Sequence, residues 1–227
     1  MLYVQLLNHR ADYFGERLAA QAFHKYKHVV CAVHHALHFT MFAAVRPDTW
    51  QHATRNIPNK FFLFLDSIGP TGPVPHHIIK LRNKLLESWN AGFVSTTHDD
   101  NEDWDEDDFV VPFTEKQYSK CLTVIGKTPN QTDQVNCGLY TAMNIEKYIQ
   151  FVLGDGMDYT RDQIFDYYDS KDREQSFNIA EVLERRKTLA QSIDRYKFSY
   201  LFFFQLDYAT FLFLPITMVE KHPLNPL

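Results

Sequence analysis

The chain is poor in cysteine and lacks the patterns that give cysteines a structural use. Its 227 residues include three cysteines, Cys31, Cys121 and Cys137, an odd number at wide spacing. This spacing suits neither a disulfide framework nor a CxxC-type metal site, so we expect a reducing compartment. A free catalytic thiol is compatible with such a setting.

Two further absences bear on where the protein works and how it is organised. The first ten residues, MLYVQLLNHR, have no basic segment and no long apolar run, so we expect no secretory signal and a location in the nucleus or cytoplasm. No internal repeat is evident, and 45% apolar with 22% charged residues is typical of a single globular domain. We expect this domain over residues 1–198 and an apolar extension over 199–227.

Positive charge is missing from residues 99–108, DDNEDWDEDD, which hold eight of the 28 acidic residues and no Lys or Arg. Like charges at this density repel one another, which favours a solvated loop inserted in the domain over a dedicated docking element. Outside this run the acidic and basic residues nearly balance. We expect a monomer with no nucleic-acid partner.

The apolar stretch at 200–219 approaches the length of a membrane span, but Gln205, Asp207 and Pro215 interrupt it. An aspartate in lipid is costly. We therefore favour strands or a buried segment over a membrane anchor, which stays open as the second reading.

Hydrophobic periodicity along the rest of the chain predicts an α+β fold with a central mixed sheet flanked by helices. Helices are predicted over 10–25, 74–90, 137–153 and 177–196, and strands over 28–33, 38–45, 60–69 and 118–130. The buried face predicted for the helix over 137–153 consists of Leu139, Ala142, Met143, Ile145, Tyr148, Ile149 and Val152.

Cys137 stands at the start of a predicted helix, within TPNQTDQVNCGLY at 128–140. Unpaired amides and the positive dipole end of a helix N-terminus stabilise a thiolate, which is the nucleophilic form of cysteine. Gly138 permits close approach of a substrate backbone, and the Gln131 amide could donate to the oxygen of a tetrahedral intermediate.

A nucleophilic thiol also needs a base and a group that orients the base. His38 opens the second predicted strand and Asp66 closes the third, so neighbouring strands would bring both to one sheet edge, facing the helix start. A buried free cysteine, a histidine at a strand end and an aspartate ending a strand would give the same pattern, so spacing leaves this structural alternative open.

His34 and His38, in HHALH, have a spacing that in a helix can hold a metal. The flanking residues favour strands, no glutamate lies between the histidines, and no third ligand is evident. We therefore expect no metal and no cofactor, and we interpret His34 and His35 as turn residues. Cys31 and Cys121 lie in strand-like runs and are expected to be core thiols.

Three motifs resemble those of the ubiquitin-like-protein-specific cysteine proteases, a family of the adenain-like clan with a papain-like catalytic domain. The family pattern P-Q-Q-x-N-x-x-D-C-G is similar to PNQTDQVNCG at 129–138, its H-W before a strand to HF at 38–39, and its D-S-L/I-G to FLDSIG at 64–69. The resemblance spans about residues 10–195 and is strong at these three motifs.

The resemblance implies a cysteine peptidase that cleaves after the C-terminal Gly-Gly of a ubiquitin-like modifier, most similar to SUMO, in precursor maturation or deconjugation. It implies Cys137 as nucleophile, His38 as base and Gln131 as oxyanion donor, with Asp66 orienting the base. Phe39 replaces the tryptophan that lines the family's tunnel for the Gly-Gly tail, and Gly138 would also contact substrate.

The chain departs from the family pattern at Asn130, Asp133 and Asn136, none of which supplies a catalytic atom. The 28 positions from His38 to Asp66 exceed the family spacing, which predicts an extended hairpin loop over 46–59. Two alternative functions stay open: an inactive module that binds a ubiquitin-like protein, and an acyltransferase of the same clan.

Overall fold

The computed structural model describes residues 2–7, 26–52, 58–69, 72–97, 113–133, 135–154 and 159–197. Within these residues five strands form one sheet in the order β1-β2-β3-β4-β5. Strands β1 and β2 are parallel, β2 to β4 are antiparallel, and β4 and β5 are parallel, so the sheet is mixed. The strands are β1 (Leu2–Leu7), β2 (His28–His35), β3 (His38–Val45), β4 (Asn59–Leu65) and β5 (Cys121–Ile125).

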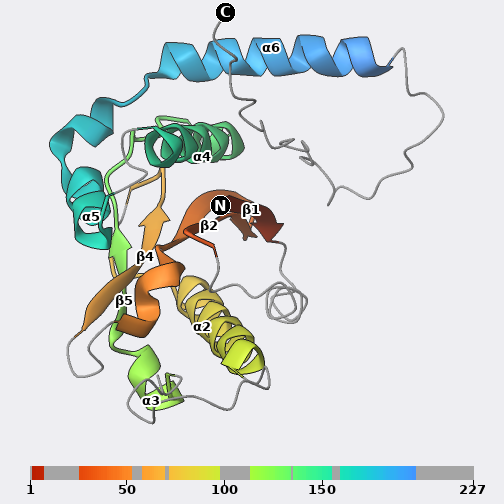
Figure 1. Ribbon diagram of the computed structural model, residues 1–227. Coiled ribbons are helices and arrows are strands. Elements are labelled where there is room, and N and C mark those ends of the chain that lie inside the picture. Colours follow the sequence, from red (N-terminus) through yellow and green to blue (C-terminus); the bar gives the residue numbers. More distant parts are fainter. Residues whose placement is uncertain are drawn as a thin grey trace, which may run out of the picture.

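Both faces of the sheet are covered by helices, so its central strands are almost continuously apolar (Figure 1). Alternate residues of one strand point to opposite faces. In β3, Phe42 and Ala44 belong to one core cluster, whereas Met41, Ala43 and Val45 belong to the other.

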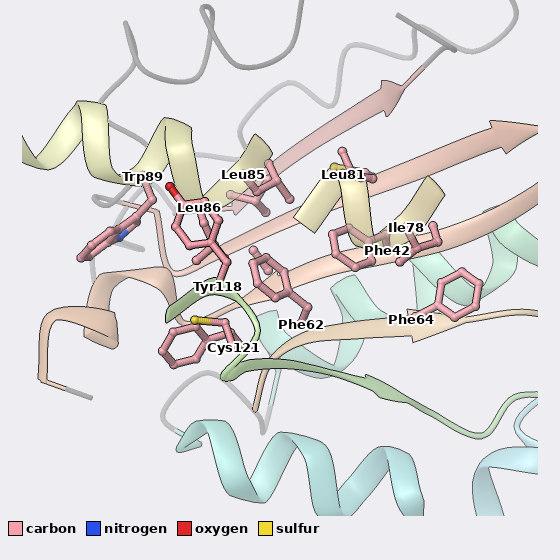
Figure 2. Packing of buried hydrophobic residues seen from close by; sticks show 14 of the residues in the cluster. Phe42, Phe62, Phe64, Ile78, Leu81, Leu85, Leu86, Trp89, Tyr118 and Cys121 are labelled. Carbon is pink, nitrogen blue, oxygen red and sulfur yellow. The ribbon is translucent and has the colours of Figure 1, made fainter. Parts of the chain in front are cut away.

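Helix α2 (His76–Thr97) covers the first face. Ile78, Leu81 and Leu85 recur at helical spacing and pack above the phenylalanines of β3 and β4 (Figure 2). All three are at most 5% exposed. Burial of one such side chain is worth about 2 kcal/mol, so this face contributes much of the stability of the sheet.

Helices α4 (Cys137–Leu153) and α5 (Arg161–Asp169) cover the second face. Tyr148 and Val152 of α4 pack with Ile164, Phe165 and Tyr168 of α5 against the sheet. Helix α6 (Ile179–Lys197) lies beside α4, outside this layer, and contributes Val182 to a small cluster with Tyr140. Among the described residues, no helix is both long enough and apolar enough to cross a membrane.

The α+β class and the central mixed sheet are confirmed, as are the three neighbouring strands β2 to β4 and the helices at 74–90, 137–153 and 177–196. Strand β1, helix α5, the 3-10 helix η5 (Lys171–Gln175) and the short helix α3 (Glu115–Tyr118) were not anticipated. The predicted helix at 10–25, the acidic run at 99–108 and the extension at 199–227 lie outside the described residues.

Strand β5 covers Cys121–Ile125 and stops before Gly126, where the sequence predicts its end; it starts three residues later than expected, because Thr114 and Gln117 form a capping box that starts α3 just before it. The interval 46–59 connects the antiparallel neighbours β3 and β4, as the predicted hairpin loop requires. Within it Pro47–His52 form the unanticipated 3-10 helix η2, which places the fully buried Trp50 in the core. Its ring stacks on Phe61 with centroids 4.7 Å apart.

The prediction for the buried face of α4 is correct for Met143, Tyr148 and Val152 and wrong for Ala142. Ala142 is exposed, whereas Tyr140, Thr141 and Asn144 are buried. Polar side chains are buried here because α6 also covers α4, and because Thr128 donates a hydrogen bond to Asn144 over 2.6 Å. A second packing partner widens the buried face beyond the apolar stripe.

Candidate active site

His38 and Asp66 meet where β3 begins and β4 ends. The two strands are antiparallel, with Met41 opposite Leu65, so the start of one and the end of the other share a sheet edge. His38 Nε2 lies 2.8 Å from Asp66 Oδ1, and the side chains are 23% and 18% exposed. The amide of Ile68 also donates to Asp66 Oδ1 over 3.0 Å, which fixes the carboxylate. Because Nε2 is bound to Asp66, Nδ1 is the ring nitrogen that can accept a proton from a thiol.

Cys137 is the first residue of α4, and its side chain reaches this edge of the sheet. It is 8% exposed, and Sγ lies 4.0 Å from the carbonyl oxygen of Leu37, the residue before His38. No hydrogen bond joins Sγ to the His38 ring among the described residues, which is common for catalytic groups before substrate binds. The 17-residue helix directs its positive dipole end at the thiol.

The turn that delivers His38 has an unusual backbone. Ala36 and Leu37 join β2 to β3 and have φ of 49° and 64°. Positive φ at both positions is the rule for the tight turns of two-residue hairpins, which Asn and Gly adopt at lowest cost. His35 pairs with His38 across this turn, so His34 and His35 belong to β2, and the prediction that they are turn residues is wrong.

Phe39 belongs to β3, and its ring lies between His34 of β2 and Gly138 at the start of α4. Its ring stacks on His34 with centroids 4.5 Å apart and an angle of 27°. On its other side, Phe39 Cδ2 lies 3.6 Å from the place that a Cβ on Gly138 would occupy. This is an ordinary contact distance, so the fold tolerates a methyl group at Gly138, and the Phe39 ring forms an aromatic wall beside the backbone there.

Gln131 is attached to the end of β4 through Ser67. The backbone amide of Gln131 donates to the backbone carbonyl of Ser67, and the Ser67 hydroxyl donates to the side-chain Oε1 of Gln131 over 3.0 Å. Gln131 Nε2 donates to the backbone carbonyl of Asp133 and, over 3.2 Å, to its carboxylate. The side-chain amide therefore faces Asp133 in the free protein.

The sequence-predicted residues form a closed series of contacts. His38 contacts Asp66, and the next residue, Ser67, binds Gln131. The series continues from Gln131 through Asp133 and Asn136 to Cys137, whose thiol lies against the residue before His38. All four residues expected to act in catalysis, and the two expected to contact substrate, thus lie in one neighbourhood.

Sequence reasoning missed the polar residues that hold this neighbourhood together. Ser67 stands inside the D-S-I-G motif, and Asp133 inside the cysteine motif, but neither position was given a function. Arg186 of α6 reaches Asn136 Oδ1 with Nη1 over 3.4 Å, a contact between residues 50 positions apart that no local signal could have revealed.

The remaining histidines and cysteines near the sheet have other surroundings. His35 stacks on His77 with centroids 4.0 Å apart. Across the described part of the chain, no three histidine, cysteine or acidic side chains are grouped so that they could hold a metal ion. Cys31 and Cys121 belong to the core, where burial raises the pKa of Cys31 and raises that of Cys121 to about 12.

Comparison with known proteins gives a similarity at the level of the backbone. No family model matches the sequence, and no curated protein matches it. Among solved structures, the chain is similar to one described as "Crystal structure of the de-sumoylating protease", with a TM-score of 0.48 and 14% identity over 87% of this chain and 72% of the other. At this identity the likeness concerns the fold alone and says nothing about which residues react.

Proposed function

We propose that the protein is a cysteine peptidase that cleaves after the C-terminal Gly-Gly of a ubiquitin-like modifier, with a SUMO-like protein or its conjugates as substrate. The observation that carries the proposal is the hydrogen bond of 2.8 Å between His38 and Asp66 at the sheet edge where Cys137 begins α4. A nucleophile, a base and an orienting carboxylate are the parts that acyl transfer by a thiol requires.

In the first half of the proposed reaction, His38 Nδ1 accepts the thiol proton and Cys137 Sγ attacks the carbonyl carbon after the second glycine. Asp66 Oδ1 accepts a hydrogen bond from the Nε2–H of His38, which orients the ring and stabilises its cationic form. The Cys137 backbone amide and Gln131 Nε2 donate to the oxyanion. Gln131 must redirect an N–H from Asp133 for this step, since Nε2 contacts Asp133 before substrate binds.

The second half releases both products. The tetrahedral intermediate collapses, the C–N bond breaks, and His38 gives its proton to the leaving amine. Water then attacks the thioester while His38 accepts a proton from it, and the thiol is regenerated as the modifier leaves with a free carboxylate. No cofactor takes part in this sequence.

The substrate class comes from the resemblance of the three motifs, in which Phe39 stands where the family has the tryptophan that lines the tunnel for the Gly-Gly tail. The Phe39 ring lies within contact distance of the Cβ position at Gly138, so an aromatic wall borders the residue after the proposed nucleophile. The same proposal includes action as a monomer in the nucleus or cytoplasm. Its substrate is either the precursor or a conjugate of the modifier.

A panel of ubiquitin-like proteins with C-terminal electrophiles tests the proposal. We expect one SUMO-like member to form a covalent adduct that mass spectrometry maps to Cys137, and Cys137→Ala to abolish it. His34→Ala serves as the matched control, because His34 contacts Phe39 but has no part in the reaction. Failure of every member of the panel to modify Cys137 would refute the proposed activity.

A further inference from the structure

The carboxylate of Asp133 collects donors from the segment that leads into Cys137. Asp133 Oδ1 accepts hydrogen bonds from the amides of Val135 and Asn136 over 2.9 and 2.8 Å, and from Gln131 Nε2 over 3.2 Å. Oδ2 accepts from Asn136 Nδ2 over 2.8 Å. All of these donors are neutral, and among the described side chains no cation forms an ion pair with Asp133.

Both ends of this arrangement are attached to the rest of the fold. Gln131 is held by Ser67 at the end of β4, and Asn136 accepts a hydrogen bond from Arg186 of α6. Asn136 directly precedes α4, and its carbonyl accepts the first helical hydrogen bond, from Tyr140 over 3.0 Å. The position of Asn136 therefore sets where α4 starts.

We propose that Asp133 is the positioning residue of the active site: its carboxylate fixes the direction of the Gln131 amide and the point at which the chain enters α4 at Cys137. The proposal deepens the proposed function, on which it rests for the meaning of Cys137 and Gln131. Hydrogen bonds to an ionised acceptor are about twice as strong as neutral ones, so one carboxylate can order the segment that leads into α4.

Asp133 precedes Cys137 in the sequence, and its charge acts on Tyr140, which follows Cys137. Hydrogen bonds, led by that from the Asn136 side chain, hold the pKa of the Asp133 carboxyl below its usual value. Burial, followed by the charge of Asp133, raises the pKa of Tyr140, which lies in the first turn of α4. Asp133 is thus an anion in the native protein, and its donors face an acceptor at both oxygens.

This pattern of donors makes the substitution Asp133→Asn informative. The variant keeps the shape of the side chain but converts one acceptor into a donor. If that donor faces Asn136 Nδ2, two donors oppose each other, and if the amide turns round, the backbone amides of Val135 and Asn136 lose their acceptor. Neither orientation gives every donor an acceptor, so the segment that leads into α4 becomes less ordered.

The exchange Asp133→Asn with Asn136→Asp reverses the two partners and makes the arrangement whole again. The new amide donates to the new carboxylate, its oxygen still accepts from the backbone, and Arg186 then faces a carboxylate. Asn136→Asp as a single change sets two carboxylates against each other. We therefore expect each single variant to be impaired and the double variant to recover.

The test measures order and thiol reactivity first, independently of any substrate. Backbone hydrogen exchange at Val135 and Asn136 should accelerate roughly tenfold in either single variant and return to within about threefold of wild type in the double variant. The rate of Cys137 alkylation by iodoacetamide should change in the single variants and recover in parallel. Asp166→Asn, at an exposed carboxylate of α5, is the matched control and should change neither.

Turnover of the substrate found with the electrophile panel forms the second arm. The single variants should lose roughly tenfold or more in kcat with little change in KM, and the double variant should recover. Unchanged exchange and alkylation in Asp133→Asn, or a double variant no better than the worse single variant, would overturn the positioning role. A wild-type protein without turnover but with the expected exchange pattern would instead overturn the proposed function. Should a single variant fail to fold, recovery in the double variant still decides.

Discussion

The Ser67 hydroxyl donates to Gln131 Oε1 over 3.0 Å, and this bond joins the residue after Asp66 to the segment before Cys137. Ser67 is 2% exposed, so water does not compete with Gln131 for its hydroxyl. Because Oε1 can only accept, the bond also decides which end of the Gln131 amide faces Asp133. The orienting carboxylate and the oxyanion donor are thereby held in one frame.

Gln131→Ala separates an enzyme from a binding module. We expect a loss of roughly 100-fold in kcat, the scale typical of one oxyanion-hole donor, because the amide acts where charge develops in the transition state. Affinity for uncleaved substrate, measured in a Cys137→Ala background, should stay nearly unchanged. Gln131→Glu should be slower still, since it places a carboxylate beside the oxyanion. A binding module would show an effect on affinity and no turnover, and undiminished turnover would remove Gln131 from the mechanism.

Thiol reactivity provides a second prediction. Limited iodoacetamide should label Cys137 well before Cys31 or Cys121, because the latter two are 0% and 2% exposed and burial raises the pKa of both thiols. Mass-spectrometric mapping over time gives the order, and labelling in denaturant, where all three should react alike, is the control. Earlier labelling of Cys121 would contradict the assignment of Cys137 as the reactive thiol.

The turn before His38 can be relaxed without loss of packing. Leu37 is 89% exposed, and both turn residues have positive φ, which costs non-glycine residues about 1–2 kcal/mol each. Ala36→Asn with Leu37→Gly should therefore raise the free energy of unfolding by about 1 kcal/mol in a denaturant titration. Leu37→Ala, which removes the same apolar side chain but keeps the strained backbone, should bring no gain. An equal gain in both variants would show that backbone strain is not the cause.

His28 gives the fold a defined sensitivity to acid. It is 3% exposed, its Nδ1 lies 2.9 Å from Tyr148 Oη, and its Nε2 has no hydrogen-bond partner in the part of the chain that the structure describes. Burial first, and then the charges of Arg46 and Lys27, lower its pKa to about 3. Between pH 6.5 and 3 the unfolded chain therefore binds a proton at His28 that the native state does not, and stability falls as the pH falls.

The expected loss is about 2 kcal/mol between pH 6.5 and pH 5. His28→Asn retains a polar atom near Tyr148 but does not titrate, so unfolding titrations at the two pH values should show a smaller loss in this variant. His76→Asn, at an exposed histidine, is the control and should behave as wild type. An undiminished acid loss in His28→Asn would assign the sensitivity to other groups.

The sequence predicted those elements in which every packed face is marked by apolar residues. Strands β2 to β4 are apolar on both faces, and α2 shows a clean stripe at Ile78, Leu81 and Leu85, so their burial could be read directly. Helix α4 has two partners, the sheet and α6, and Tyr140, which periodicity did not single out, packs with Val182 of the second partner. The 3-10 helix η2 was missed because the anchor that holds it, Trp50, packs on residues from distant segments.

The site also consists of residues that the sequence predicted and of contacts that it did not. His38, Asp66 and Cys137 follow motifs at the ends of elements, and knowing that β3 and β4 are neighbours suffices to bring the first two together. The bonds from Ser67 to Gln131 and from Arg186 to Asn136 cross 64 and 50 positions. Such contacts depend on how loops and helices pack on the sheet, and a single sequence carries no signal for them.

The central claim is that His38, held by Asp66, activates Cys137, and kcat of His38→Ala tests it most directly. Turnover of the substrate identified with the electrophile panel should fall by about 100-fold or more, the typical contribution of a general base, with affinity for uncleaved substrate retained. His34→Ala and His35→Ala, measured alongside, should keep kcat within a few-fold of wild type. A His38→Ala protein that turns over at the wild-type rate would contradict the account.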